Sequence, residues 1–303
     1  MSPPYGGRVE RTWQPDGPLD LHRTLGPLRH GPRDPTQRVE RDGTIWRATR
    51  TPAGPATLRL RQDGAVHAEA WGPGAEWVLD GVPELAGHAH DLAFDHPVLA
   101  KTLRRHPGVR IPRTRRVFEA LVPAVIEQKV TGQEAFAAIA TLTRRYGDPA
   151  PGPAPAGLFV PPAPATWGLI PSWEWHTAGV DPRRMRTVLA AAKVANRLEE
   201  TVTMSRGDAQ RRLTAVPGIG EWTAAEVGAR ALGDTDALSV GDFHISAHVG
   251  WALLGRPIDD DEMVALLEPW RPYRAVVIRL IELSGIAKPR FGPRMTIQDH
   301  RAH

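Results

Sequence analysis

The chain has 303 residues, of which 41% are hydrophobic and 24% charged, a composition typical of a folded protein with room for two or three domains. It contains no cysteine, which excludes disulfides, thiolate zinc sites and cysteine-bound iron–sulfur clusters. The net charge of +4 is compatible with a polyanionic partner or with an ordinary solvated surface. The most apolar stretch, residues 275–287, is interrupted by Arg279 and Glu282 and predicts no membrane span. Because the N-terminus also lacks the apolar core of a signal peptide, we expect a cytoplasmic protein.

The first third of the chain predicts a small antiparallel sheet. Residues 1–37 are rich in Pro, Gly and Arg and indicate an extended or partly helical lead-in. Apolar and polar residues alternate over 44–50 and 56–62, and a third run, 65–71, follows an Asp-Gly pair typical of hairpins. We therefore expect an N-terminal antiparallel sheet domain over residues 1–96.

From residue 97 onward the pattern is helical. Residues 97–105 predict one short helix, and 114–146 predict two helices that are separated near Thr131-Gly132. The prolines of residues 148–165 exclude helix there. Further helices are predicted over 183–198, 243–254, 261–267 and 273–286. The fold class is thus α+β, with a mostly helical domain over 97–290 and a C-terminal tail over 291–303.

Six arginines without an intervening acid lie in the segment that precedes the long helical stretch. Such a segment is typical of a phosphate-facing patch, and equally of a basic loop that faces water. The arginines are Arg104, Arg105, Arg110, Arg113, Arg115 and Arg116.

Two groups of histidines raise the question of a metal. His88, His90 and His96 lie in a Gly- and Pro-interrupted region without a carboxylate framework, and His244 and His248 have helical spacing but no third ligand. We therefore favour surface or pocket roles and expect no metal held by side chains.

The stretch VPGIG at residues 216–220 indicates a tight turn between two helices. Pro217 ends the incoming helix, and Gly218 and Gly220 allow backbone conformations and close approaches that other residues do not. The helix that restarts at Glu221 has first-turn amides without an intrahelical partner, an arrangement that suits a phosphate. Such contacts would position a nucleic acid without reading its sequence.

The turn and its surroundings resemble the helix-hairpin-helix DNA glycosylases, and within them the bacterial 3-methyladenine DNA glycosylase II (AlkA-like) class. The resemblance rests on LxxVPGIGxWTA with Asp242 beyond it, HPGVRIP at 106–112, FEALVPAVIEQKVTGQEA at 118–135 and PWRPYRA at 269–275. It covers residues 97–286 and implies a helix-hairpin-helix over 209–232.

By this resemblance Asp242 is the catalytic residue, although an aspartate at that point also caps a helix, and both roles are compatible. An anion beside the sugar would stabilise the positive charge that forms when an N-glycosidic bond breaks. Bifunctional relatives have a lysine where this chain has Trp222, so the resemblance implies a monofunctional hydrolase.

The resemblance also implies a base pocket and a DNA-binding surface. A flipped base needs aromatic walls, and an indole face attracts a cationic base. Lys129 stands where the class has an apolar wedge, so it stays open whether Lys129 or Gln128 fills the gap left by the base. The pocket residues are Trp222, Trp270, Tyr273, Phe243 and His244. The DNA-binding residues are Val216, Pro217, Gly218, Ile219, Gly220, Thr223, Gln128 and Lys129.

We thus expect a glycosylase that excises alkylated (3-methyladenine- or 7-methylguanine-like) bases from double-stranded DNA and leaves an abasic site. It would act as a monomer in the nucleoid, without a cofactor, although the hairpin of the class can hold a monovalent cation by backbone carbonyls. Two alternatives remain. One is a same-fold glycosylase for an oxidised or deaminated base, and the other is a non-catalytic protein that binds damaged DNA.

Overall fold

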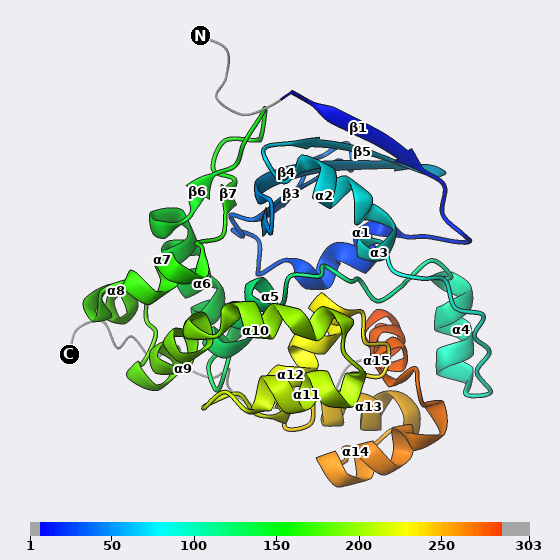
Figure 1. Ribbon diagram of the computed structural model, residues 1–303. Helices are drawn as coiled ribbons and strands as arrows, with labels where there is room; N and C mark the ends of the chain where they lie inside the picture. The colour runs from blue at the N-terminus through cyan, green and yellow to red at the C-terminus, as the bar shows by residue number, and fades with distance from the viewer. Residues whose placement is uncertain (1–6, 287–303) are drawn as a thin grey trace.

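The computed structural model describes residues 7–286 and places a five-stranded antiparallel sheet above a body of helices (Figure 1). The strand order is β1-β5-β4-β3-β2. The strands are β1 (Val9–Trp13), β2 (Gln37–Val39), β3 (Ile45–Thr51), β4 (Gly54–Asp63) and β5 (Ala65–Trp71).

The sheet follows from the sequence pattern, apart from its edges. The predicted runs become β3, β4 and β5, and the β4–β5 hairpin turns at Gly64, whose φ of +101° favours glycine. The predicted lead-in also supplies β1, which pairs with β5 at one edge. Four short helical elements of this part pack beside the sheet around Leu25, Leu58 and Leu79. They are α1 (Leu21–Leu25), η1 (Gly26–Leu28), α2 (Ala75–Asp80) and α3 (Val82–Leu85).

The remaining described residues are mostly helical, as predicted. No helix within residues 7–286 is long and apolar enough to cross a membrane. The elements, in chain order, are α4 (Pro97–Arg105), α5 (Val117–Ile126), α6 (Gly132–Tyr146), α7 (Pro164–Leu169), α8 (Ser172–Thr177), α9 (Pro182–Lys193), α10 (Ala195–Glu199), η2 (Glu200–Thr203), α11 (Arg206–Thr214), α12 (Glu221–Val227), η3 (Gly228–Leu232), α13 (Ile245–Leu254), α14 (Asp260–Leu267), η4 (Glu268–Trp270) and α15 (Arg274–Leu283).

Side-chain caps mark the start of several of these helices. Thr131 and Glu134 form a reciprocal capping box at the start of α6, which accounts for the predicted break in the 114–146 stretch. Ser205 accepts from the amide of Asp208 and opens α11. Two predictions need correction. The 183–198 helix divides at Val194, whose φ of −118° is not helical, and the 243–254 helix begins at Ile245.

The proline-rich segment 148–165 contains a two-residue pairing of β6 (Asp148–Pro149) with β7 (Phe159–Val160), and its last residues begin α7. It lies against the sheet, where the rings of Trp46 and Trp71 stack 5.6 Å apart in a cluster with Val160. The hydroxyl of Thr57 donates to the carbonyl of Pro151 at 2.7 Å. The segment therefore ties the helical part back to the sheet. The domain division near residue 96 stays a prediction, and the tail 291–303 lies outside the described residues.

The interpretation of the arginine-rich segment as an exposed basic patch or loop needs correction, because four of its six arginines are buried or partly buried. The Arg110 side chain is 2% exposed and donates to Asp16 and to the carbonyl of Gly87. Arg115 lies over the ring of Trp77 at 4.1 Å. These arginines therefore join the sheet to the helices. Two of the six are exposed: Arg104 and Arg105.

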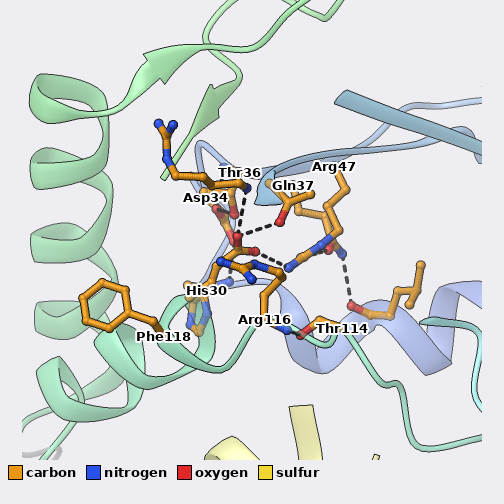
Figure 2. A network of polar contacts seen from close by, with 12 residues as sticks. His30, Asp34, Thr36, Gln37, Arg47, Thr114, Arg116 and Phe118 are labelled. Carbon is orange, nitrogen blue, oxygen red and sulfur yellow. Dashed lines mark hydrogen bonds and ion pairs between the residues drawn. The ribbon is translucent and has the colours of Figure 1, made fainter. Parts of the chain in front are cut away.

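Polar contacts continue this junction toward α5. Figure 2 shows Arg47 and Gln37 of the sheet close to Arg116, which precedes α5. Arg47 donates to Gln37 at 3.1 Å and pairs with Glu119 at 2.7 Å, and its side chain is 8% exposed. The buried Arg47 guanidinium thus has a carboxylate partner, as burial requires.

Candidate active site and DNA interface

The hairpin is built from α11, the turn at residues 215–220 and α12, which η3 continues. Val216 and Ile219 are buried and anchor the turn between the helices, and the amide of Ile219 donates to the carbonyl of Val216 at 3.1 Å. Pro217 is exposed at the tip. The turn therefore presents backbone rather than side chains.

The two glycines of the turn serve different purposes. Gly218 has a φ of +90°, and a Cβ there would meet the Thr187 hydroxyl at 2.1 Å. Gly220 has an extended backbone and open space around the position of a Cβ. The backbone conformation and the close contact with Thr187 therefore require glycine at position 218. At position 220, the absence of a side chain leaves room for a ligand to approach the first amides of α12.

The loop between α5 and α6 is fastened to this turn. The side-chain amide of Gln128 donates to the carbonyl of Gly218 at 3.0 Å and to the hydroxyl of Thr223 at 2.8 Å. Lys129, next along the chain, is exposed and has a φ of +56°. The structure thus engages Gln128 with the hairpin and leaves the Lys129 side chain facing solvent at the loop's tip.

Asp242 is held from two sides. Its Oδ1 accepts from the backbone amides of His244 at 2.8 Å and Ile245 at 3.1 Å, at the start of α13. Its Oδ2 accepts from the indole N–H of Trp222 on α12 at 3.1 Å. The carboxylate is partly exposed, so it is both a helix cap and an oriented anion open to a ligand.

The other predicted pocket residues fall into two groups. Phe243 is 83% exposed and meets the ring of His244 edge-on, with centroids 4.9 Å apart, beside Asp242. Trp270 and Tyr273 pack against the hydrophobic cluster formed by α4, α13, α14 and α15, and Tyr273 lies 5.1 Å from the ring of His90. The observed contacts bring Trp222 directly to the carboxylate and place Trp270 and Tyr273 in that cluster.

No group of three His, Cys, Asp or Glu side chains within residues 7–286 is arranged to hold a metal ion. His244 and His248 stack with ring centroids 6.1 Å apart.

The fold has relatives among solved structures. The 3-methyladenine DNA-glycosylase from Archaeoglobus fulgidus superposes with a TM-score of 0.73 at 19% identity, over 92% of this chain and 98% of that one. The 8-oxoguanine glycosylase/lyase of Clostridium acetobutylicum, in complex with DNA, superposes with a TM-score of 0.66 at 12% identity, over 88% and 91%. At these identities the likeness defines the fold.

The chain is also similar in sequence to a DNA repair enzyme. The probable bifunctional transcriptional activator/DNA repair enzyme AlkA of Mycobacterium tuberculosis is 32% identical over 201 residues, which is 65% of this chain. The chain is thus similar in sequence to part of a DNA repair enzyme and in fold to DNA glycosylases. It spans 38% of the length of this AlkA relative. No protein-family model matches the chain.

A buried ion pair fixes the loop that leads to Asp242. Arg274 donates from Nε and Nη2 to the two oxygens of Asp236, each at 2.8 Å, and Arg206 adds a contact at 2.9 Å. Burial by itself raises the pKa of Asp236, but the Arg274 guanidinium outweighs it and the net pKa is lowered. Burial raises the pKa of neighbouring Asp234. Sequence reasoning missed this pair, since its partners are far apart in the chain.

A second polar group beside Asp242 was also missed. Glu226 follows Trp222 by one helical turn on the same face of α12. It accepts from the hydroxyl of Ser239 at 2.5 Å and pairs with Arg230 at 2.6 Å. The carbonyl of Ser239 in turn accepts from the amide of Asp242 at 3.2 Å. The four-residue spacing from Trp222 is the sequence signal that could have identified Glu226.

Proposed function

We propose that this chain is a monofunctional DNA glycosylase that flips an alkylated base out of duplex DNA and hydrolyses its N-glycosidic bond. One observation carries the proposal: the Asp242 carboxylate is fixed by Trp222 and by the α13 amides, directly beside a turn shaped to hold a phosphate backbone. A protein that only bound DNA would gain nothing from an oriented anion facing a chain of phosphates.

The chemistry needs one carboxylate. As the bond between C1′ and the base nitrogen breaks, the base leaves with the bonding electron pair and the sugar becomes an oxocarbenium-like cation, which the Asp242 anion stabilises. Water then attacks C1′ and gives its proton to the carboxylate or to solvent. A base that is already cationic leaves as a neutral molecule and needs no general acid, which favours alkylated purines.

The hairpin supports the DNA side of the proposal. The first amides of α12 lack intrahelical acceptors, and the open space at Gly220 lets a phosphate approach them. We propose that Lys129, exposed at the tip of the neighbouring loop, enters the duplex gap while Gln128 holds that loop to the turn. The base, once extruded, would lie against Trp222, with His244 and Phe243 at the entrance.

The proposed products are a free base and an abasic site, without strand cleavage. Trp222 has no amine and cannot form a Schiff base with the sugar. The fold itself is neutral on this point, because the C. acetobutylicum protein with the same fold is described as a glycosylase/lyase. That likeness also keeps an oxidised base as the second candidate substrate.

The test is to incubate the protein with methylated duplex DNA and to measure free bases by chromatography and abasic sites by heat cleavage. Asp242→Asn keeps the side-chain shape and one acceptor oxygen, and should lower release by about 10²–10³-fold while duplex binding persists. Release that survived in this variant would contradict the mechanism. A wild-type protein that binds damaged duplexes but releases no base from methylated or oxidised DNA would be a binding protein.

A further inference from the structure

The chain segment that follows η1 lies against both helices that flank the Lys129 loop (residues 127–131). The Nδ1 of His30 is 2.9 Å from Oε1 of Glu127, the residue at the C-terminal end of α5. The ring of His30 also packs against the ring of Phe136 on α6, with centroids 6.2 Å apart. One side chain of the N-terminal lead-in therefore contacts α5 where the loop begins and α6 shortly after the loop ends.

The contact between His30 and Glu127 is directed and shielded. A carboxylate only accepts hydrogen bonds, so the Nδ1 of His30 is the donor. The two side chains are 13% and 17% exposed, and water and salt therefore screen their interaction little. The backbone of His30 is held separately, because its amide donates to Oδ2 of Asp34 at 2.7 Å (Figure 2). The position of the imidazole is thus fixed before the loop is considered.

The backbone of Lys129 has a conformation that residues other than glycine rarely adopt. Its φ is +56°, in the left-handed region. A residue keeps such a conformation when its surroundings fix it, and residues of this kind are concentrated at functional sites. Gln128 is held by the hairpin, and Thr131 by the capping box of α6. The remaining anchor of the loop is Glu127, which His30 holds.

We propose that His30 is a positioning residue of the DNA interface. Through Glu127 it holds the loop in the conformation in which Lys129 enters the duplex gap. This inference rests on the proposed function, in which Lys129 takes that place. It also gives the N-terminal lead-in a role in the reaction, since a residue of that segment sets the shape of the DNA interface without contacting DNA.

Two variants of His30 separate its hydrogen bond from its ring contact. His30→Asn keeps an N–H group at the place of Nδ1, since both nitrogens are attached to Cγ, but it loses the ring. His30→Phe keeps a ring against Phe136 but has no N–H group. The matched control is His67→Phe, which removes a histidine contact with Asp63 on the exposed part of the sheet.

Each variant is made in the full chain and measured in two ways. The first is the affinity for a duplex with a tetrahydrofuran abasic analogue, and the second is single-turnover base release from methylated duplex. His30→Phe should weaken binding about three- to tenfold, the range of one side-chain contact within a network. It should slow release about tenfold, because a displaced positioning group costs catalysis even when it lies away from the chemistry. His30→Asn and His67→Phe should stay within about twofold of wild type in both measurements.

A combination with Lys129→Ala distinguishes positioning from a general loss of stability. In the Lys129→Ala background, His30→Phe should change the affinity by less than about 1.5-fold, because the group that His30 positions is gone. A variant that only lowered the fraction of folded protein would weaken binding by the same factor in both backgrounds. Thermal unfolding of all variants is measured in parallel.

The outcomes separate this inference from the proposed function. Wild-type behaviour of His30→Phe would overturn the positioning role and leave the proposed function intact. A loss in His30→Asn that equals or exceeds the loss in His30→Phe would do the same, as would an undiminished effect of His30→Phe in the Lys129→Ala background. A wild-type protein that released no base from methylated or oxidised DNA would overturn the proposed function, and the affinities for the abasic duplex would still decide the role of His30.

Discussion

The indole N–H of Trp222 donates a hydrogen bond of 3.1 Å to the Oδ2 of Asp242. Trp222 lies in the first turn of α12, immediately after the glycine turn, whereas Asp242 precedes α13. The bond therefore fixes the distance between the segment that we propose grips the DNA backbone and the carboxylate that we propose acts on the sugar. A phosphate held at the turn would place its nucleotide at a defined distance from Asp242.

Trp222→Phe should lower base release by about ten- to a hundredfold, because it removes a neutral donor to a charged acceptor while keeping an aromatic ring. Binding to a duplex with an abasic analogue should stay within about twofold of wild type, since no base is present to stack on the ring. Single-turnover release measures the first effect and fluorescence anisotropy the second. A release rate equal to that of wild type would show that the hydrogen bond does not orient Asp242 for the reaction.

Borohydride should trap no covalent complex between the protein and DNA, because a reducible imine needs an amine at the sugar and Trp222 offers none. The reaction is run with damaged duplex and resolved by denaturing electrophoresis. The positive control is a glycosylase with lyase activity on the same duplex. A trapped band would contradict the monofunctional proposal. Its loss in Lys129→Arg would then identify Lys129, exposed beside the hairpin, as the nucleophile.

Gly218→Ala and Gly220→Ala form a matched pair. The first places a Cβ at 2.1 Å from the Thr187 hydroxyl and at a φ of +90°, so it should destabilise the fold by about 1–3 kcal/mol. The second meets open space and should leave the melting temperature unchanged, while it weakens duplex binding because a methyl group faces the phosphate. Calorimetry and binding isotherms measure both. Equal duplex affinity for Gly220→Ala and wild type would argue against a phosphate at this turn.

Lys129→Ala should weaken duplex binding. In a plot of log K against log salt concentration, the slope should become less steep by about one unit, because one DNA-facing cation is lost. Lys101→Ala removes an exposed lysine of α4 and serves as the control, with an unchanged slope expected. Affinity is measured at several salt concentrations. If both variants keep the wild-type slope, Lys129 does not contact the DNA.

The Asp236–Arg274 pair should make the free energy of unfolding depend on pH in the acidic range. The folded pKa of Asp236 is lowered, so the pair stabilises the native state above the unfolded value near 3.8 and loses that contribution as pH falls below it. Asp236→Asn should cost about 3–5 kcal/mol at neutral pH, because the Arg274 guanidinium keeps its burial and loses its counter-charge.

Between pH 7 and 3, the melting temperature of Asp236→Asn should change less with pH than that of wild type. Asp80→Asn, which alters an exposed pair with Arg11, is the control and should follow wild type. A wild-type acid slope retained in Asp236→Asn would assign the acid sensitivity to other carboxylates.

Features that depend on neighbouring residues in the chain could be predicted from the sequence. The Asp-Gly hairpin, the α4 bounds and the capping residues Thr131 and Ser205 were predictable because periodicity and capping act over a few residues. The glycine turn was identifiable for the same reason. Asp242 was singled out by the resemblance to a known family, and its catalytic role stays a prediction.

Contacts between side chains that are distant in the sequence could not be predicted in this way. Arg110 looked like a DNA-facing cation, yet it is buried against Asp16, because a charge run carries no information about the segment that folds over it. Gln128 donates to Thr223 of the hairpin, 95 positions away, and Glu226 accepts directly from Ser239 of the following loop. Such partners depend on how the helices pack. Packing brings together residues that are far apart in the sequence, and the sequence separation does not predict which of them will be in contact.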